Sequence, residues 1–141
     1  MVPRPGKPLP AAPLRLQVDG VDPGVLQAGL APLQAAAEQA AEPGAEPAPL
    51  CITADPSMGG SPQGYRLGID ADGVSIRAPA EQGLFYGLCT MRQIAEAGGP
   101  WPAVDIEDAP ALAVRGVMLD ISRDKVPTME TLYALVDRLA S

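Results

Sequence analysis

Histidine is absent from the 141-residue sequence. It is the commonest general base near neutral pH and the commonest protein ligand for transition metals. Its absence excludes a histidine-based catalytic triad and a histidine-based zinc site built from this chain alone. We therefore expect neither a metal nor another cofactor.

Cysteines and aromatic residues are scarce. The two cysteines, Cys51 and Cys89, lie too far apart in the sequence for a CxxC metal or redox motif. Each lies in an apolar run, so we interpret both as buried free thiols, with one disulfide between them as the alternative. Aromatic residues make up 4% of the chain, which leaves little material for a sugar-stacking platform.

Long hydrophobic runs and an excess of basic charge are also missing. No stretch of about 18 apolar residues occurs, so no membrane span is expected. The first 13 residues hold five prolines and no apolar core of a signal peptide. A cytoplasmic location is the default, although removal of a signal from a longer precursor leaves secretion open. The net charge of −7 argues against nucleic acid as a partner.

The composition is that of one folded domain. Hydrophobic residues make up 47% of the chain, so a core can be buried. The length is too small for a complete eight-stranded βα barrel, which needs about 250 residues. Most of the 17 prolines and 15 glycines fall between periodic segments and separate them.

Alternating apolar and polar residues predict several strands. An Asp-Gly pair at 72–73 separates two of the alternating runs and predicts a tight hairpin. Tyr65, Leu67 and Ile69 share one face of its first strand. The run at 50–54 is continuously apolar, so we expect that strand to be buried on both faces. The predicted strands are 14–19, 50–54, 65–70, 74–78 and 101–107.

Helical spacing of apolar residues predicts two helices, over 25–42 and 81–98. Pro32 should kink the first helix or mark its true start. Gly83 and Gly87 lie one turn apart on the second. Small residues at this spacing indicate a close approach of the helix to the sheet, with ligand contact as the alternative.

The last segment has a different pattern. Residues 114–121 form an almost continuous apolar run, which is typical of a parallel strand covered on both faces. A loop follows at 122–128. Thr128 then caps a helix that is predicted over 128–140 and whose apolar face carries leucines and a valine.

Three segments resemble family 20 glycoside hydrolases, the β-N-acetylhexosaminidases. They are GLFYGL at 83–88, EDAP at 107–110 and RGVMLDISR at 115–123. The last is the most specific of the three. It has two arginines, a glycine, an aspartate and a serine at fixed spacing in a strand and the loop that follows. The resemblance covers the chain from about Tyr65 to its end.

The resemblance implies an α+β fold with an antiparallel, or mixed, sheet and two helices on one face. One βα unit of an incomplete TIM barrel would follow this domain. We therefore expect a flexible proline-rich arm at 1–13, a hexosaminidase-type N-terminal domain at 14–110, and the first strand and helix of a truncated catalytic (βα)8 barrel at 111–141.

The resemblance also implies a retaining, substrate-assisted hydrolysis of terminal β-linked N-acetylhexosamine. A glutamic acid would act as the general acid, and an adjacent aspartate would orient the acetamido group of the substrate. That pair belongs after a later barrel strand, so we expect this chain by itself to be an inactive fragment. We interpret Glu107 and Asp108 as part of a linker and not as this pair.

One substrate-binding residue is implied within the chain. Arg123 closes the motif and would bind hydroxyl groups of the terminal sugar; the alternative is a solvent-exposed loop arginine. We expect Arg115 and Asp120 to brace the ends of the strand. Many family members have histidine directly after the arginine, whereas Asp124 stands here, which leaves the substrate preference open.

Three functions remain open. The first is the N-terminal part of a hexosaminidase whose partner is an N-acetylhexosamine-containing glycan. The second is a free-standing carbohydrate- or protein-binding module, and the third is a related domain of another barrel enzyme such as a glucuronidase. The apolar residues of the last segment should either form a homodimer through 111–141 or fold back on the small domain.

Overall fold

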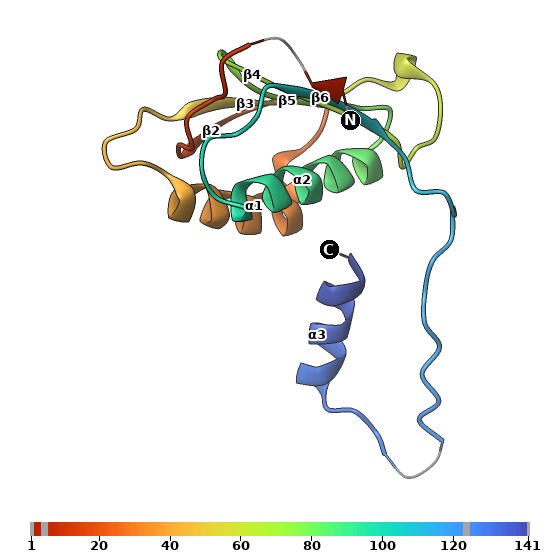
Figure 1. Cartoon of the computed structure of the whole chain (residues 1–141). Coiled ribbons are helices and arrows are strands. Elements are labelled where there is room, and N and C mark those ends of the chain that lie inside the picture. Colours follow the sequence, from red (N-terminus) through yellow and green to blue (C-terminus); the bar gives the residue numbers. More distant parts are fainter. Residues whose placement is uncertain (1, 4–5, 123–124, 141) are drawn as a thin grey trace. The chain divides into compact units, whose positions relative to one another are not determined.

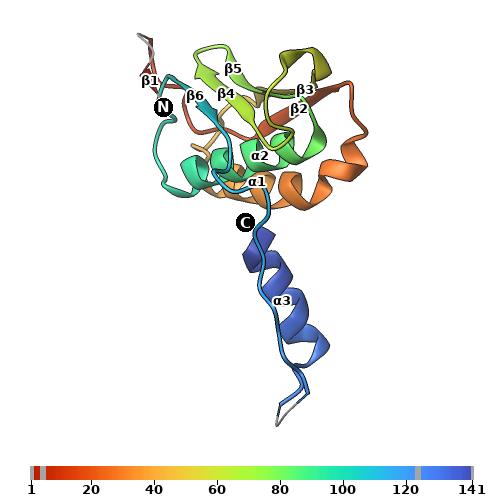
Figure 2. The same ribbon diagram turned by 90° about the vertical axis from the view of Figure 1, so that its right-hand side faces the viewer.

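The computed structural model describes residues 2–3, 6–122 and 125–140. Its contacts divide the chain into two units, residues 1–110 and 111–141, which are described separately. The first unit is a mixed six-stranded sheet with two helices on one of its faces (Figures 1 and 2). This confirms the predicted α+β class.

The sheet has the strand order β1-β6-β4-β5-β3-β2. Strand β3 pairs in parallel with β2 and with β5, whereas the pairs β4–β5, β4–β6 and β1–β6 are antiparallel. The strands are β1 (Val2–Pro3), β2 (Leu14–Asp19), β3 (Ala48–Ala54), β4 (Tyr65–Asp70), β5 (Gly73–Ala78) and β6 (Val104–Asp108).

The hairpin β4–β5 forms as the sequence predicts. Its turn requires glycine at position 73, because φ is +144° and an added Cβ would lie 2.6 Å from the carbonyl oxygen of Pro49. The inward-facing residues of both strands are buried, which confirms the predicted face of β4. They are Tyr65, Leu67, Ile69, Val74, Ile76 and Ala78.

Strand β3 is covered on only one face. Leu50 and Ile52 are buried beneath the helices, while Cys51 and Thr53 are half-exposed. The prediction that this strand is buried on both faces was therefore wrong. Its apolar run misleads because both helices lie on the same face of the sheet and leave the other face open.

Helix α1 (Gln27–Ala40) links the parallel strands β2 and β3, and a 3-10 turn, η1 (Pro23–Leu26), precedes it. Asp22 starts this turn, because its Oδ1 accepts a hydrogen bond of 2.9 Å from the backbone N–H of Gly24. Pro32 lies inside α1 and does not mark its start. The helix predicted over 25–42 is thus observed as a 3-10 turn followed by an α-helix.

Helix α2 (Glu81–Glu96) approaches the sheet closely at two glycines. A Cβ at position 83 would lie 2.1 Å from the carbonyl oxygen of Gly64, and one at position 87 would lie 2.6 Å from Cγ2 of Ile76. The prediction of close helix–sheet packing is confirmed. The contacts at both positions are with the sheet and with the loop before it.

The N-terminal residues differ from the flexible arm that the prolines suggested. Leu9, Ala11 and Ala12 are buried in the core of the domain. Leu9 and Trp101 also exchange backbone hydrogen bonds of 2.9 and 2.7 Å. The interpretation of residues 1–13 as an arm was wrong for this part, because prolines interrupt a hydrogen-bonded ladder but leave the apolar residues between them free to pack.

Both cysteines are free thiols. Cys89 is buried on α2, and burial raises the pKa of its thiol. Cys51 is half-exposed on the open face of the sheet, where its Sγ donates to Oε1 of Gln17 at 3.3 Å. One thiol therefore lies on the sheet and the other on a helix, and no disulfide joins them.

In the second unit, α3 (Met129–Ala140) is the one regular element among the described residues. Thr128 caps it as predicted, since the backbone N–H of Thr131 donates to its Oγ1 at 3.2 Å. The predicted strand 114–121 is not formed, although all of its residues are described. A strand needs a neighbouring strand to pair with its backbone groups, and this segment has none. No described helix is both long and apolar enough to cross a membrane.

Candidate functional site

The RGVMLDISR segment contains the residues singled out for function. Its described part, residues 115–122, is an irregular and exposed chain. Arg115 donates from Nη1 to the backbone carbonyl of Leu112, three residues earlier. This contact is local, and the predicted role of Arg115 in bracing the end of a strand stays a prediction.

Asp120 organises the end of the same segment. Its Oδ1 accepts hydrogen bonds from the backbone N–H of Ser122 at 2.8 Å and from the hydroxyl of Ser122. These bonds stabilise the carboxylate and lower the pKa of Asp120 below its ordinary value of 3.8. The aspartate and serine of the motif thus form a side-chain-stabilised turn directly before position 123.

Arg123, the predicted sugar-binding residue, lies outside the described residues, as does Asp124. The role of Arg123 therefore stays a prediction. The turn at Asp120 and Ser122 directly precedes this position in the chain.

Glu107 and Asp108 end strand β6 and are not the linker that the sequence suggested. Oε1 of Glu107 pairs with Nη2 of Arg66 on the neighbouring strand at 3.2 Å. Oδ1 of Asp108 accepts from the backbone N–H of Ala109 at 2.8 Å. Both carboxylates are exposed, and their contacts stabilise the end of β6.

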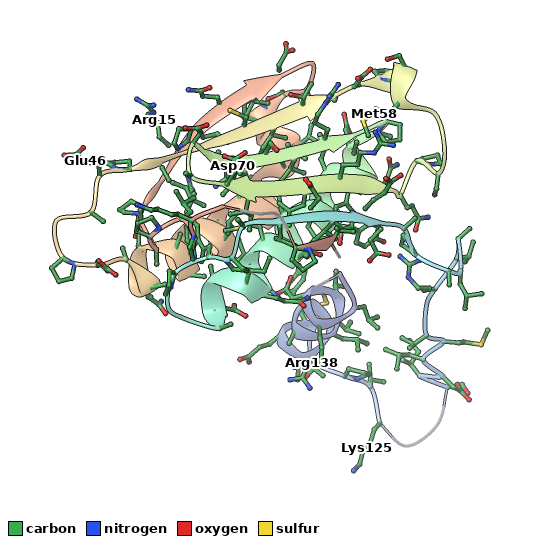
Figure 3. All side chains as sticks on the ribbon, turned by 45° about the horizontal axis from the view of Figure 1, so that its top comes forward. Arg15, Glu46, Met58, Asp70, Lys125 and Arg138 are labelled. Carbon is green, nitrogen blue, oxygen red and sulfur yellow. The ribbon has the colours of Figure 1, made fainter. Side chains whose placement is uncertain are left out.

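A cleft of about 360 Å³ lies at this end of the sheet. The loop between β3 and β4 forms one wall through lining residues from Met58, which Figure 3 labels, to Gly64. The ends of β5 and β6 and the beginning of β4 form the remainder, with Arg66, Glu107 and Asp108 as the charged residues. Sequence reasoning did not identify this cleft, because the three segments that line it are far apart in the chain.

Tyr65 lies at the inner side of this cleft. Its hydroxyl is 2.6 Å from Oγ1 of Thr90 on α2, and its side chain is buried. Burial is the main cause of its raised pKa, and the negative charge of Asp108 adds to it. The phenol therefore stays neutral and links the sheet to the helix, which is a structural role.

Aromatic faces for stacking a sugar are not presented by the sheet. Tyr65 and Trp101 are buried in the core, and Phe85 and Tyr86 are half-buried on α2. Among the described residues no group of three or more metal-ligating side chains occurs. The geometry of this domain thus gives no support to a sugar-stacking binding module.

Apolar side chains are concentrated on the exposed surface of the second unit. Met118 is 95% exposed and Val114 is 89% exposed. On α3, Tyr133, Val136 and Leu139 are exposed as well. Single exposed apolar residues are ordinary, whereas a large group of them is typical of a surface that takes part in an interaction.

Comparison with known sequences gives a family. The sequence model described as glycosyl hydrolase family 20, domain 2, matches residues 11–109. A β-hexosaminidase of Porphyromonas gingivalis is 34% identical over 84 residues, which cover 52% of this chain and 11% of that protein. An N,N'-diacetylchitobiase of Vibrio harveyi is 29% identical over 79 residues, covering 55% of this chain and 9% of that protein.

Solved structures of the same family share the fold. A mutant Streptomyces plicatus β-hexosaminidase in complex with the product GlcNAc is 27% identical with a TM-score of 0.70, and the match covers 98% of this chain and 30% of that chain. A family 20 β-N-acetylglucosaminidase is 32% identical with a TM-score of 0.60 and covers 97% and 26%, respectively. The chain spans between 5% and 16% of the curated relatives reported for it.

Proposed function

Because this chain belongs to glycosyl hydrolase family 20 and carries domain 2 of that family at residues 11–109, we propose that it works as part of a β-N-acetylhexosaminidase. Such an enzyme hydrolyses terminal β-linked N-acetylhexosamine from a glycan. The family match over 11–109 is the observation that carries the proposal. Relatives described as β-hexosaminidase and N,N'-diacetylchitobiase, and a structural neighbour holding GlcNAc, support the substrate class.

We assign the catalytic carboxylates to protein outside the present sequence. The resemblance implies an adjacent aspartate and glutamate, and Glu107-Asp108 is the one place where the two residue types are adjacent. There, however, Glu107 is paired with Arg66 at the end of a strand and Asp108 bonds to the backbone. The contribution of this chain is therefore a folded domain and one sugar-binding residue, and the chain alone is inactive.

Arg123 is that sugar-binding residue in our proposal. A guanidinium presents a planar fork of donors that can bond two neighbouring hydroxyl groups of a sugar. The position follows the turn formed by Asp120 and Ser122, so the preceding backbone has a defined course. Barrel enzymes place substrate-binding groups in loops that follow strands, where the family motif puts this arginine.

A chimera tests this function. Residues 1–141 replace the matching part of the Streptomyces plicatus enzyme, and hydrolysis of a chromogenic N-acetylglucosaminide is measured. We expect an active chimera, with kcat/KM lowered about a hundredfold by Arg123→Ala, since two charge-assisted hydrogen bonds are lost. Arg123→Lys should retain part of the activity.

Lys7→Ala, at an exposed position of the domain, serves as the control and should leave kcat/KM unchanged. Turnover by the isolated 141-residue chain would contradict the assignment of the carboxylates. An Arg123→Ala chimera as active as its parent would contradict the role of the arginine.

For the partner, we propose that the apolar surface of residues 112–139 is covered by protein in the functional state. The side chains that support this are Leu112, Val114, Val117, Met118, Leu119, Ile121, Val126, Met129, Tyr133, Val136 and Leu139. In the isolated chain the same surface would associate with a second copy and give a homodimer through 111–141.

A further inference from the structure

Strand β2 forms one edge of the sheet. Strand β3 pairs with it on one side, and no described strand pairs with its other side. Edge strands expose backbone N–H and C=O groups that can pair with another chain, and proteins often protect them with charged side chains, especially lysine, with a proline or with a bulge. The six residues of β2 include neither lysine nor proline, and each pairs one-to-one with β3. This edge is therefore regular and open to a further strand.

The side chains of β2 leave apolar surface partly exposed on one face of this edge and charges without ion-pair partners on the other. Toward the helices, Leu14, Leu16 and Val18 pack against the core but stay half-exposed. On the open face, Arg15 and Asp19 are exposed, and neither has an ion-pair partner among the described residues. Figure 3 shows Arg15 on the outermost strand with its side chain extending away from the sheet. A strand placed beside β2 would bury apolar surface on one face and meet two unpaired charges on the other.

We propose that this strand is the β2 of a second copy of the chain, added in antiparallel orientation about a two-fold axis at Gln17. In that register Arg15 lies opposite Asp19 of the second copy, and by symmetry Asp19 lies opposite Arg15. Leu16 lies opposite Val18 of the second copy, so apolar side chains meet on the helix face. The two sheets then join into one continuous sheet, which is β-strand addition between identical chains.

The charges of Arg15 and Asp19 favour this register over the other possible registers of the strand pair. A shift that moves the pairing by one residue would place the apolar face of one copy beside the polar face of the other. A centre at Leu16 or Val18 keeps the faces but separates Arg15 from Asp19. Parallel pairing in register would bring Arg15 beside Arg15, and like charges directly opposite each other are destabilising. Only the centre at Gln17 forms two Arg–Asp pairs, which is why the sequence of β2 fits a second copy of itself.

Charge reversal tests this interface in the whole chain by sedimentation equilibrium. The variants carry Val136→Lys and Leu139→Lys so that α3 does not add a second mode of association. Arg15→Asp and Asp19→Arg should each weaken the dimer about tenfold, because each turns two opposite-charge pairs into like-charge pairs. The double variant R15D/D19R restores both pairs with reversed sign and should dimerise within about threefold of the parent chain.

Lys7→Asp is the matched control for charge reversal away from the edge, and it should not change the dimer constant. A chain that stays monomeric at all concentrations would overturn the proposal. So would a double variant that associates as weakly as either single variant.

Disulfide trapping tests the register independently. Gln17→Cys in a Cys51→Ser background, which removes the neighbouring thiol on β3, places two cysteines opposite each other at the two-fold axis. Mild oxidation should convert this variant to a covalent dimer. Arg15→Cys in the same background places its cysteine opposite Asp19 of the second copy and should remain uncrosslinked. Equal crosslinking of the two variants, or none at position 17, would overturn the register.

Discussion

Arg66 on β4 and Arg77 on β5 lie directly opposite each other across the hairpin. Each guanidinium is paired with a carboxylate from a different element, Arg66 with Glu107 at 3.2 Å and Arg77 with Asp55 at 2.7 Å. Like charges at directly opposite positions destabilise a sheet. The two carboxylates offset this repulsion, so the domain can keep a strand register that sets two arginines opposite each other.

The carboxyl of Asp55, which pairs with Arg77, should make the stability of the domain depend on pH. The hydroxyl of Ser57 is the largest cause of the lowered pKa of Asp55, and the backbone N–H of Ser57 and Arg77 lower it further. A carboxyl with a lowered pKa in the folded state stabilises that state above its ordinary pKa of 3.8 and loses the effect as pH falls through the folded value. Asp55→Asn should therefore lower the free energy of unfolding at neutral pH, with a difference that shrinks below pH 3.8.

Denaturant unfolding of both proteins over this acidic range measures the difference. Asp72→Asn, in the exposed hairpin turn, controls for the loss of one negative charge. A difference for Asp55→Asn that stays constant through the acidic range would contradict the prediction.

The close approach of α2 to the sheet predicts that its glycines tolerate no side chain. Gly87→Ala should lower the free energy of unfolding by about 1–3 kcal/mol, because its Cβ meets the side chain of Ile76. Gly83→Ala should cost more, because its Cβ meets the backbone carbonyl of Gly64, which cannot rotate away. Thermal and denaturant unfolding measure both effects.

Gln93→Ala, at an exposed position of the same helix, is the control and should change stability by less than about 0.5 kcal/mol. A Gly83→Ala variant as stable as this control would show that the helix can move off the sheet.

The burial of the N-terminal segment predicts that Leu9 contributes to the core. Leu9→Ala should lower the free energy of unfolding by about 2–3 kcal/mol, because a side chain that is only 6% exposed is truncated. Lys7→Ala, two residues away and exposed, should have little effect. If the two variants were equally stable, residues 1–13 would behave as the arm that their prolines suggest.

The exposed apolar residues of α3 predict association of the isolated chain. Val136→Lys combined with Leu139→Lys should weaken self-association and lower the binding of a hydrophobic dye, since both side chains are more than half exposed. Light scattering and dye fluorescence measure these changes. Light scattering and dye fluorescence that stay at the level of the parent chain would contradict the prediction.

The periodicity of the sequence predicted the local elements well. Strands 14–19 and 65–70 have the predicted bounds, and the hairpin turn at Asp72 and Gly73 forms as expected. The predicted bounds of α2 differ from the observed ones by two residues at the C-terminal end. These successes have one cause, since each element follows from the spacing of apolar residues over a short window and from the backbone freedom of glycine in a turn.

The failures concern residues whose state depends on neighbours distant in sequence. Leu9 is buried because Trp101 lies beside it, and the proline content of its own segment does not indicate this. Cys51 is half-exposed because both helices cover the other face of β3. The run at 114–121 has the composition of a buried strand but no strand beside it.

The sequence by itself determined most of the helices, strands and turns of residues 14–108, and its motifs indicated the family. Only the tertiary structure decided the strand order, which sets Arg66 against Arg77 and leaves β2 at an edge. The physical reason is that apolar spacing and turn residues act over a few neighbours along the chain. Strand order and burial, by contrast, depend on which distant segments supply the remaining hydrogen bonds and cover the remaining apolar surface.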